Sequence, residues 1–168
     1  KGIIWGRDLD LTDDAAVFVP TASVLEGGGD PREPLHADSL LAQGLLPMHE
    51  GKTFHQFDDY WGDRPRYVIK SATLFSDFRA FAKCSRRYRG AIREVASATN
   101  ERTLIAALLP PGVACSKKIY CERAQERRAD STTLGLISVL DSFVADFLLR
   151  LRVQSSVSLF ILDSTPVP

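Results

Sequence analysis

Residues 47–62, PMHEGKTFHQFDDYWG, combine most of the side-chain types that do chemistry or bind ligands in proteins. A glutamate, a lysine, two histidines, a glutamine and two aspartates stand among aromatic residues. Each polar group that leaves water needs a partner, so buried segments seldom hold this many. The segment therefore predicts a site or a binding face.

The triplet Glu50-Gly51-Lys52 has the E-x-K spacing of metal-dependent DNA-cleaving sites, and Asp38 precedes Glu50 by twelve positions. Two carboxylates that hold Mg²⁺ beside a lysine activate water against a phosphate. Because E-x-K triplets are common, a nuclease built on Asp38, Glu50 and Lys52 is the alternative hypothesis rather than the main one.

Other metal and nucleophile patterns are weaker. His49 and His55 are six positions apart in a segment of extended character, whereas the metalloprotease motif needs two histidines four apart on a helix. Cys84, Cys115 and Cys121 include no C-x-x-C pair and no zinc spacing, which predicts reduced, structural thiols. We therefore expect no metal site and no catalytic residue in the chain.

Charge is distributed unevenly along a chain whose net charge is zero. Residues 1–51 carry 3 basic and 9 acidic side chains (net −6), residues 52–128 carry 16 and 8 (net +8), and residues 129–168 carry 2 and 4 (net −2). A basic surface within a neutral protein indicates contact with phosphates, although a charged, solvated helix face gives the same pattern.

The first half of the chain predicts short elements. Residues 16–21 fit an edge strand, because Pro20 has no amide to donate. Residues 37–43 fit a short helix that Gly44 stops, and residues 45–57 read as an extended chain with a polar half. In that strand we expect Phe54 and Phe57 to point inward, and Lys52, His55 and Gln56 outward, which requires a bulge or turn.

The second half predicts strands between two helices. Residues 66–70 alternate like a strand, and residues 76–89 fit a basic helix. Residues 90–96 and 102–109 fit a hairpin with a turn at SATNE, and residues 112–122 fit a further strand. Apolar positions at helical spacing predict one long helix over 133–153, and residues 157–163 read as a final strand.

Three blocks in order carry a family resemblance: LPMHEGKTFHQFD (46–58), IREVASATNERTLIAALLPPGVA (92–114), and LGLISVLDSFVADFLLRLRV with LFILDSTPVP (134–153 and 159–168). They resemble the C-terminal region of large N6-adenine DNA methyltransferases, namely type IIG restriction-modification enzymes and their phage-defence relatives. The match spans residues 46–168, and residues 1–45 match less clearly. The chain begins without methionine and ends at PVP, so we expect one domain that is a fragment of a larger enzyme.

The resemblance implies a target-recognition domain that contacts double-stranded DNA beside the methyltransferase domain of a parent chain. The family's methyl-donor pocket and NPP-aromatic motif do not occur here, and LPPG at 109–112 begins with Leu109, which has no amide for adenine. We therefore expect no cofactor in this chain, and S-adenosylmethionine only in the parent enzyme. A protein-interaction domain that docks on the parent through its long helix stays open as another class.

Residue types suggest which side chains would contact DNA bases and which would contact phosphates. Arginine and lysine pair with guanine, and asparagine and glutamine pair with adenine, so Gln56, Arg93, Asn100 and Arg102 are candidates for bases. His55 suits either role. The candidates for phosphates are Lys52, Arg64, Arg66, Arg86, Arg87, Lys117 and Lys118.

Several of these residues also have plain structural interpretations. Asn100 suits a turn, Glu101 and Arg102 suit an ion pair, and Asp58 suits a role in holding His55 or Arg93. Tyr60 and Trp61 suit a core or base stacking.

Length and composition limit the class. A chain of 168 residues with 45% hydrophobic residues suits one globular domain, and no apolar run approaches the roughly 20 residues of a membrane span. We therefore expect a cytoplasmic α+β domain. An antiparallel or mixed sheet would pack with a long C-terminal helix and a shorter basic helix.

Overall fold

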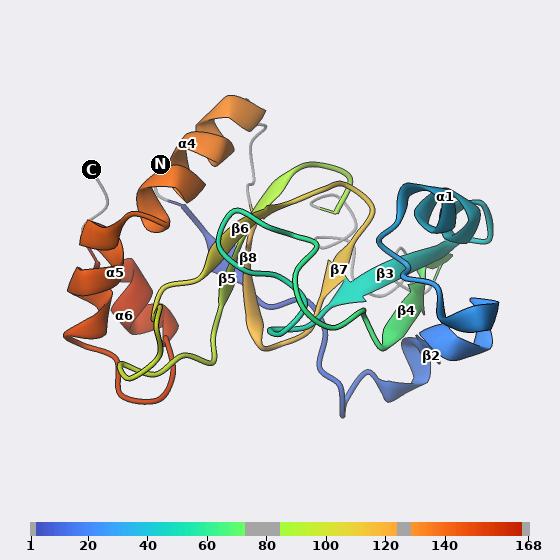
Figure 1. Cartoon of the computed structure of the whole chain (residues 1–168), viewed down its shortest axis with the longest axis horizontal. Helices are drawn as coiled ribbons and strands as arrows, with labels where there is room; N and C mark the ends of the chain where they lie inside the picture. The colour runs from blue at the N-terminus through green and yellow to red at the C-terminus, as the bar shows by residue number, and fades with distance from the viewer. Residues whose placement is uncertain (1–2, 73–84, 124–128, 166–168) are drawn as a thin grey trace.

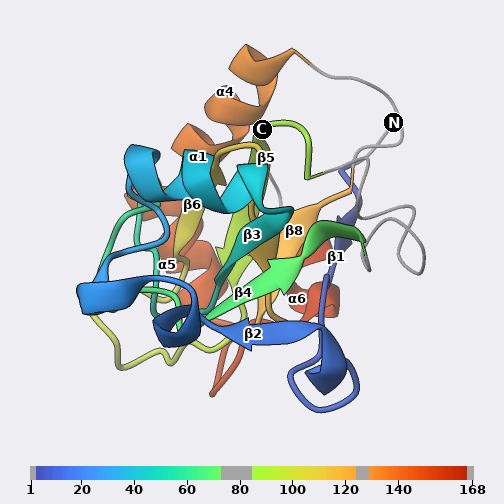
Figure 2. The ribbon, with the colours of Figure 1, turned by 90° about the vertical axis from the view of Figure 1, so that its right-hand side faces the viewer.

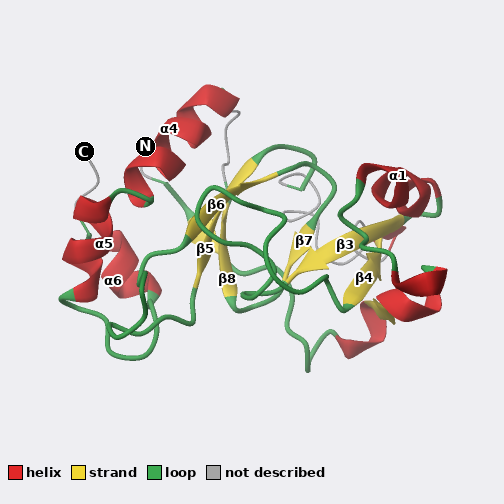
Figure 3. Cartoon of the chain, viewed as in Figure 1, coloured by secondary structure: helices red, strands yellow, loops and turns green. Residues whose placement is uncertain are grey.

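The computed structural model describes residues 3–72, 85–123 and 129–165. The chain is α+β, as predicted: two four-stranded sheets lie in the middle, with helices at both ends (Figures 1 and 3). The first sheet is antiparallel throughout, in the order β1 (Trp5–Gly6), β8 (Ile119–Glu122), β5 (Arg89–Arg93), β6 (Ala106–Leu109). The second is mixed, in the order β2 (Phe18–Pro20), β4 (Tyr67–Lys70), β3 (Leu45–His49), β7 (Ala114–Cys115).

The second sheet confirms the predicted edge strand. β2 pairs only with β4, and Pro20 is its last residue, where a missing amide costs no ladder hydrogen bond (Figure 2). β3 pairs antiparallel with β4 and parallel with β7. All five residues of β3 are buried, because β3 lies between two neighbouring strands and is covered by α1 (Pro34–Ala42).

α1 is the predicted short helix, although it begins three residues earlier than expected. Pro34 lies in its first turn, where the missing amide costs nothing, and Gly44 follows its end with φ +70°. Leu40 of α1 packs with Leu45 and Val68 in a small cluster of the core.

The predicted hairpin is confirmed as β5 and β6, which pair from Arg89↔Leu109 to Ile92↔Ala106. The chain between them, residues 94–105, leaves the ladder. It turns where the backbone amide of Asn100 donates to the Ser97 carbonyl (3.1 Å). Residues 112–122, predicted as one strand, form two: β7 joins the second sheet and β8 the first. A turn at Ser116 to Lys118 thus links the two sheets.

The single long helix predicted over 133–153 is wrong. Two helices, α4 (Asp130–Leu140) and α5 (Phe143–Arg150), meet at a bend of 58°. Ser142 begins α5, because its hydroxyl accepts a hydrogen bond from the Ala145 amide (3.2 Å). The Asp141 carboxylate meanwhile accepts from the amides of Ala106 and Phe57, so both residues at the bend bind backbone groups.

The final strand predicted at 157–163 is also wrong. Ser158 accepts from the Ile161 amide (3.3 Å) and begins a one-turn helix, α6 (Leu159–Asp163). A short apolar run does not distinguish a strand from a buried helix, so the pattern misled. Leu162 of α6, Leu149 of α5 and Ile137 of α4 pack with Ile92 and Tyr120 of the first sheet.

Most of the predicted basic helix at 76–89 lies outside the described residues. Its end is wrong, since Ser85 to Tyr88 form a turn and bend, and Arg89 opens β5. Short 3₁₀ helices lie at Ala15–Val17, Thr21–Ser23 and Glu26–Gly28. Within the described ranges, no single helix is long and apolar enough to cross a membrane, and only the bent pair of α4 and α5 passes that test of length and composition together.

Candidate functional site

Residues 47–62 form a strand end followed by tight turns, rather than the extended chain predicted. After His49 the chain turns, and the Thr53 hydroxyl and amide both donate to the Glu50 carbonyl (each 3.0 Å). Gly62 then has φ +65°, and a Cβ there would lie 2.6 Å from the Lys52 carbonyl oxygen. Only glycine fits this position, so the glycine is what lets the two ends of the loop come close together.

The turns change which side chains point inward. Phe54 is fully buried, as predicted, whereas Phe57 is 66% exposed and has φ +60°, contrary to the prediction. Tyr60 and Trp61 are about half exposed, so they do not close a core: Tyr60 lies against the Arg32 guanidinium (4.4 Å), and Trp61 against the His55 ring (5.1 Å).

A shallow groove of about 450 Å³ brings together residues from four separate parts of the chain. Five of the twelve predicted DNA contacts line it: Lys52, Arg66, Arg93, Asn100 and Lys118. Glu50, Gly51 and Ser116 complete its polar wall, with Leu11 and Val95. We call this the basic groove, because its lining holds four basic side chains and one acidic one.

Three of the four basic side chains have anionic partners at the groove. Arg66 Nε donates to both oxygens of the buried Glu50 (2.9 and 3.1 Å), which fixes that carboxylate in the wall. Lys52 pairs with Asp63 (2.6 Å) and Lys118 with Glu94 (3.6 Å), and both lysines are about half exposed. Exposed pairs of this kind contribute little to stability, so a stronger anion displaces them readily.

Arg93 differs from the other three, since it forms no ion pair within the described part of the chain. It is half-buried, its Nη2 donates to the Phe54 carbonyl, and its guanidinium lies 5.7 Å from the Phe54 ring centre. Burial lowers the pKa of Arg93, so its charge is disfavoured where it stands. An anion bound in the groove would offset that cost.

Two hydrogen-bonding groups at this groove are buried without a partner among the described residues: Arg93 Nε and Ser116 Oγ. Buried polar groups in native proteins are nearly always paired, so an unpaired one calls for an explanation. Both can donate to an oxygen. The sequence did not single out Ser116, because nothing in SKK indicates that its hydroxyl is buried at the same groove as Arg93.

Gln56 and His55 lie elsewhere and have structural partners. Gln56 Nε2 donates to the carbonyls of Leu104 (3.2 Å) and Asp141 (3.5 Å), which ties the loop to the chain just before β6 and to the bend between α4 and α5. His55 exchanges backbone hydrogen bonds with Asp58 (2.8 and 3.1 Å). Burial, with Arg93 nearby, lowers the pKa of His55, so the ring is neutral at physiological pH.

The other predicted contacts also lie outside the groove. Arg102 stacks on the Phe143 ring (3.9 Å) near Asp146, not Glu101, and Lys117 pairs with Asp10. Arg64 is exposed, and Arg86 and Arg87 lie in the turn before β5. The described basic residues of the middle of the chain are therefore not gathered at one site.

The residues of the nuclease alternative do not share a cavity. Glu50 and Lys52 line the basic groove, whereas Asp38, on α1, lines a different one beneath that helix. Glu50 is also occupied by Arg66. This placement gives the nuclease alternative no support.

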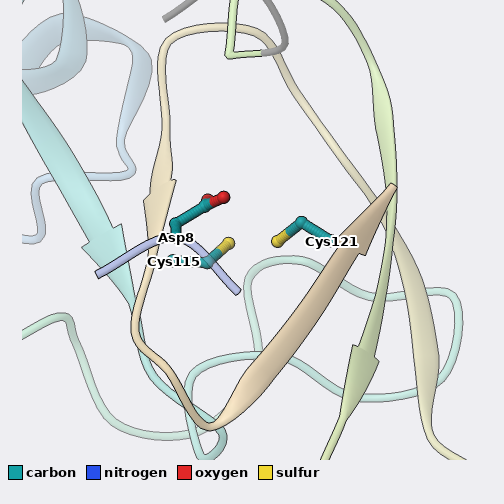
Figure 4. A group of neighbouring side chains, drawn as sticks. All are labelled: Asp8, Cys115 and Cys121. Atoms are coloured by element: carbon teal, nitrogen blue, oxygen red, sulfur yellow. The ribbon is translucent and has the colours of Figure 1, made fainter. Parts of the chain in front are cut away.

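One buried cluster in the described part of the chain has the atoms to hold a metal: Asp8, Cys115 and Cys121, whose ligand atoms lie within 4.8 Å of one another (Figure 4). The sequence could not show it, since Asp8 is far from the two cysteines in the chain. Cys115 and Cys121 are free thiols, as predicted, whereas Cys84 lies outside the described residues. Burial raises the pKa of Cys121.

Arg89 already occupies this cluster as a cation. Its Nη1 donates to Asp8 Oδ2 (3.0 Å), and both side chains are almost fully buried. Burial raises the pKa of Asp8, which disfavours the charge of this carboxylate. Burial alone would lower the pKa of Arg89, but the neighbouring Cys121 and Asp8 outweigh it, so the pKa of Arg89 is raised. We take the pair as charged because of its geometry and because the Arg123 guanidinium also faces Asp8 (3.9 Å). A divalent ion would meet two guanidinium groups, so we assign this cluster a structural role.

Comparison of the chain with protein-family models and with curated proteins found no match.

Proposed function

We propose that the chain binds double-stranded DNA through the basic groove, as the target-recognition part of an N6-adenine DNA methyltransferase or a fused restriction enzyme. The observation that carries the proposal is the pair of unpartnered groups, Arg93 Nε and Ser116 Oγ. They lie in a groove lined by four basic side chains and one acidic side chain. Phosphate oxygens satisfy both groups and neutralise the half-buried Arg93.

The residues divide between two tasks. Lys52 and Lys118 are exposed at the groove and suit phosphates, where charge matters more than orientation. Asn100 is the groove's amide side chain, exposed on a turn, and an amide is the group that pairs with adenine. Methyl transfer itself requires the parent's methyltransferase domain and its S-adenosylmethionine.

The test is fluorescence anisotropy of the chain with a labelled mixed-sequence duplex as salt is raised. The logarithm of affinity should fall linearly with the logarithm of salt concentration, since bound cations leave the phosphates. The double variant Lys52→Gln/Lys118→Gln should reduce that slope by about 2, roughly one for each lysine. Lys70→Gln, an exposed lysine of β4 outside the groove, should leave it unchanged.

If the double variant kept the full slope, the groove would not be the DNA-binding surface. Mg²⁺ is included and the products are run on a gel, because fragments that disappear in Glu50→Gln would instead support a nuclease.

A specific observation also favours a second candidate, docking on the rest of the parent protein. Phe143, Phe147 and Leu151 lie at i, i+4 and i+8 along α5 and are 79%, 59% and 68% exposed. Monomeric proteins seldom leave such an apolar stripe uncovered. Hydrogen–deuterium exchange should show α5 amides that are slower in the parent protein than in this chain alone. Equal exchange in the two would exclude the docking face.

A further inference from the structure

A second cavity, of about 220 Å³, lies between α1, β3 and the turn at 110–113. No residue lines both this cavity and the basic groove. Leucines of α1 and β3 and the prolines of the turn form apolar walls. The polar side chains are Arg32, Asp38, His49 and Asp59, so we call it the His49 cavity.

His49 is 1% exposed and has one nitrogen without a partner. Its Nδ1 shares a hydrogen bond with Thr53 Oγ1 (2.9 Å), and the Phe54 ring meets it edge-on (6.3 Å between centres). Its Nε2 has no hydrogen bond within the described ranges. Burial, with Arg32 and Arg89, lowers the pKa of His49 to about 3, so the imidazole is neutral at physiological pH. An unpaired buried nitrogen costs free energy that a ligand would recover.

Arg32 does not offer its charge to a ligand. Its Nη1 donates to the carbonyls of Thr53 (2.7 Å) and Trp61 (3.0 Å). Its Nε and Nη2 bind Asp30 (3.0 and 2.6 Å), which neutralises it. The charges that remain at the cavity are the half-buried Asp59 and the exposed Asp38. Two carboxylates disfavour anions and favour a ligand that donates hydrogen bonds.

We propose that the His49 cavity binds a flat heteroaromatic ring with an exocyclic amino group, of the size of a pyrimidine base. An apolar cavity of about 150 Å³ holds benzene, so the volume suits a single substituted ring. Because the Thr53 hydroxyl donates to the Glu50 carbonyl, His49 Nδ1 donates to that hydroxyl, and the neutral ring leaves Nε2 as an acceptor. The amino group donates to Asp59, a ring N–H donates to His49 Nε2, and the leucine and proline walls cover the faces. This inference stands apart from DNA binding in the basic groove, since it uses other residues.

Cytosine and uracil provide a matched pair of probes, because they differ chiefly in an amino group against a carbonyl. Isothermal titration calorimetry of the chain at pH 8 should show cytosine binding at least about tenfold more tightly than uracil, whose carbonyl faces the Asp59 carboxylate. The His49 ring resonances should shift in the same titration followed by NMR. Equal affinity for the two bases, or binding of neither, would overturn the proposal.

Variants locate the binding. Asp59→Asn should weaken cytosine binding about tenfold and reduce the preference over uracil. Asp59 is only half-buried, so this variant is expected to fold, and its thermal midpoint checks that. Asp163→Asn, at the exposed end of α6, is the matched control and should bind as the wild type does. An Asp59→Asn variant with unchanged affinity would also overturn the assignment.

The ring can come from a free base or from a base extruded from nucleic acid. A cytosine in a strand carries its sugar on N1 and so has no ring N–H for His49 Nε2. Oligodeoxycytidine should therefore leave bound cytosine in place, which would assign the ring to a free base. Displacement of cytosine by oligodeoxycytidine would overturn the pairing with Nε2. Failure of the groove variants to change DNA binding leaves both results standing, so the two proposals fail independently.

Discussion

Asp141 lies at the bend between α4 and α5, and its two oxygens accept hydrogen bonds from the amides of Ala106 (3.0 Å) and Phe57 (3.1 Å). Burial raises its pKa from 3.8 to about 6, which outweighs the two amides. Between these pH values the folded protein holds a proton that the unfolded chain has lost. The stabilisation from that proton is full below about pH 4 and is lost as the pH rises through about 6.

Urea unfolding of the wild type and Asp141→Asn across this pH range measures the contribution. The free energy of unfolding of the wild type, minus that of the variant, should fall as the pH rises from about 4 to about 6 and then level. Taking this difference cancels the contributions of the other carboxyl groups to the pH dependence. Asp163→Asn controls for the loss of a charge. A difference that is flat with pH would show that Asp141 does not titrate there.

At the scale of elements, the sequence predicted the parts that depend on local patterns. Pro20 identified an edge strand, Gly44 the end of α1, and the SATNE turn a hairpin. It failed where a distant partner decides: Asp141 and Ser142 interrupt an apolar helical pattern because one holds β6 and the other begins α5. The split of residues 112–122 between two sheets likewise depends on pairings that no local pattern encodes.

The candidate site was predictable to a similar extent. Residue type indicated the basic side chains that line the basic groove, since Lys52, Arg66, Arg93 and Lys118 are all cationic. It could not show that Gln56 binds carbonyls or that Arg102 stacks on Phe143. Nor could it show the unpartnered nitrogen of His49 or the unpartnered hydroxyl of Ser116, because burial without a partner is a property of the fold.

Across the whole molecule, the charge segregation along the chain is partly cancelled by folding. The acidic N-terminal part pairs with the basic middle through Asp8 and Arg89, Asp10 and Lys117, and Glu50 and Arg66. A net charge of +8 over residues 52–128 therefore overstates the basic surface. Among the described residues, the basic groove gathers four of the basic side chains of this segment.

The Asp8–Arg89 pair also joins the N-terminal segment to β5, so it should matter far more than a surface pair. Asp8→Asn removes a fully buried negative charge that faces the guanidinium groups of Arg89 and Arg123. We expect a loss of about 3 kcal/mol in the free energy of unfolding at pH 7, measured by urea denaturation. Asp63→Asn breaks the exposed pair with Lys52 and should change stability little. Equal, small effects of the two substitutions would mean that the N-terminal segment is not held to the sheet by this charge.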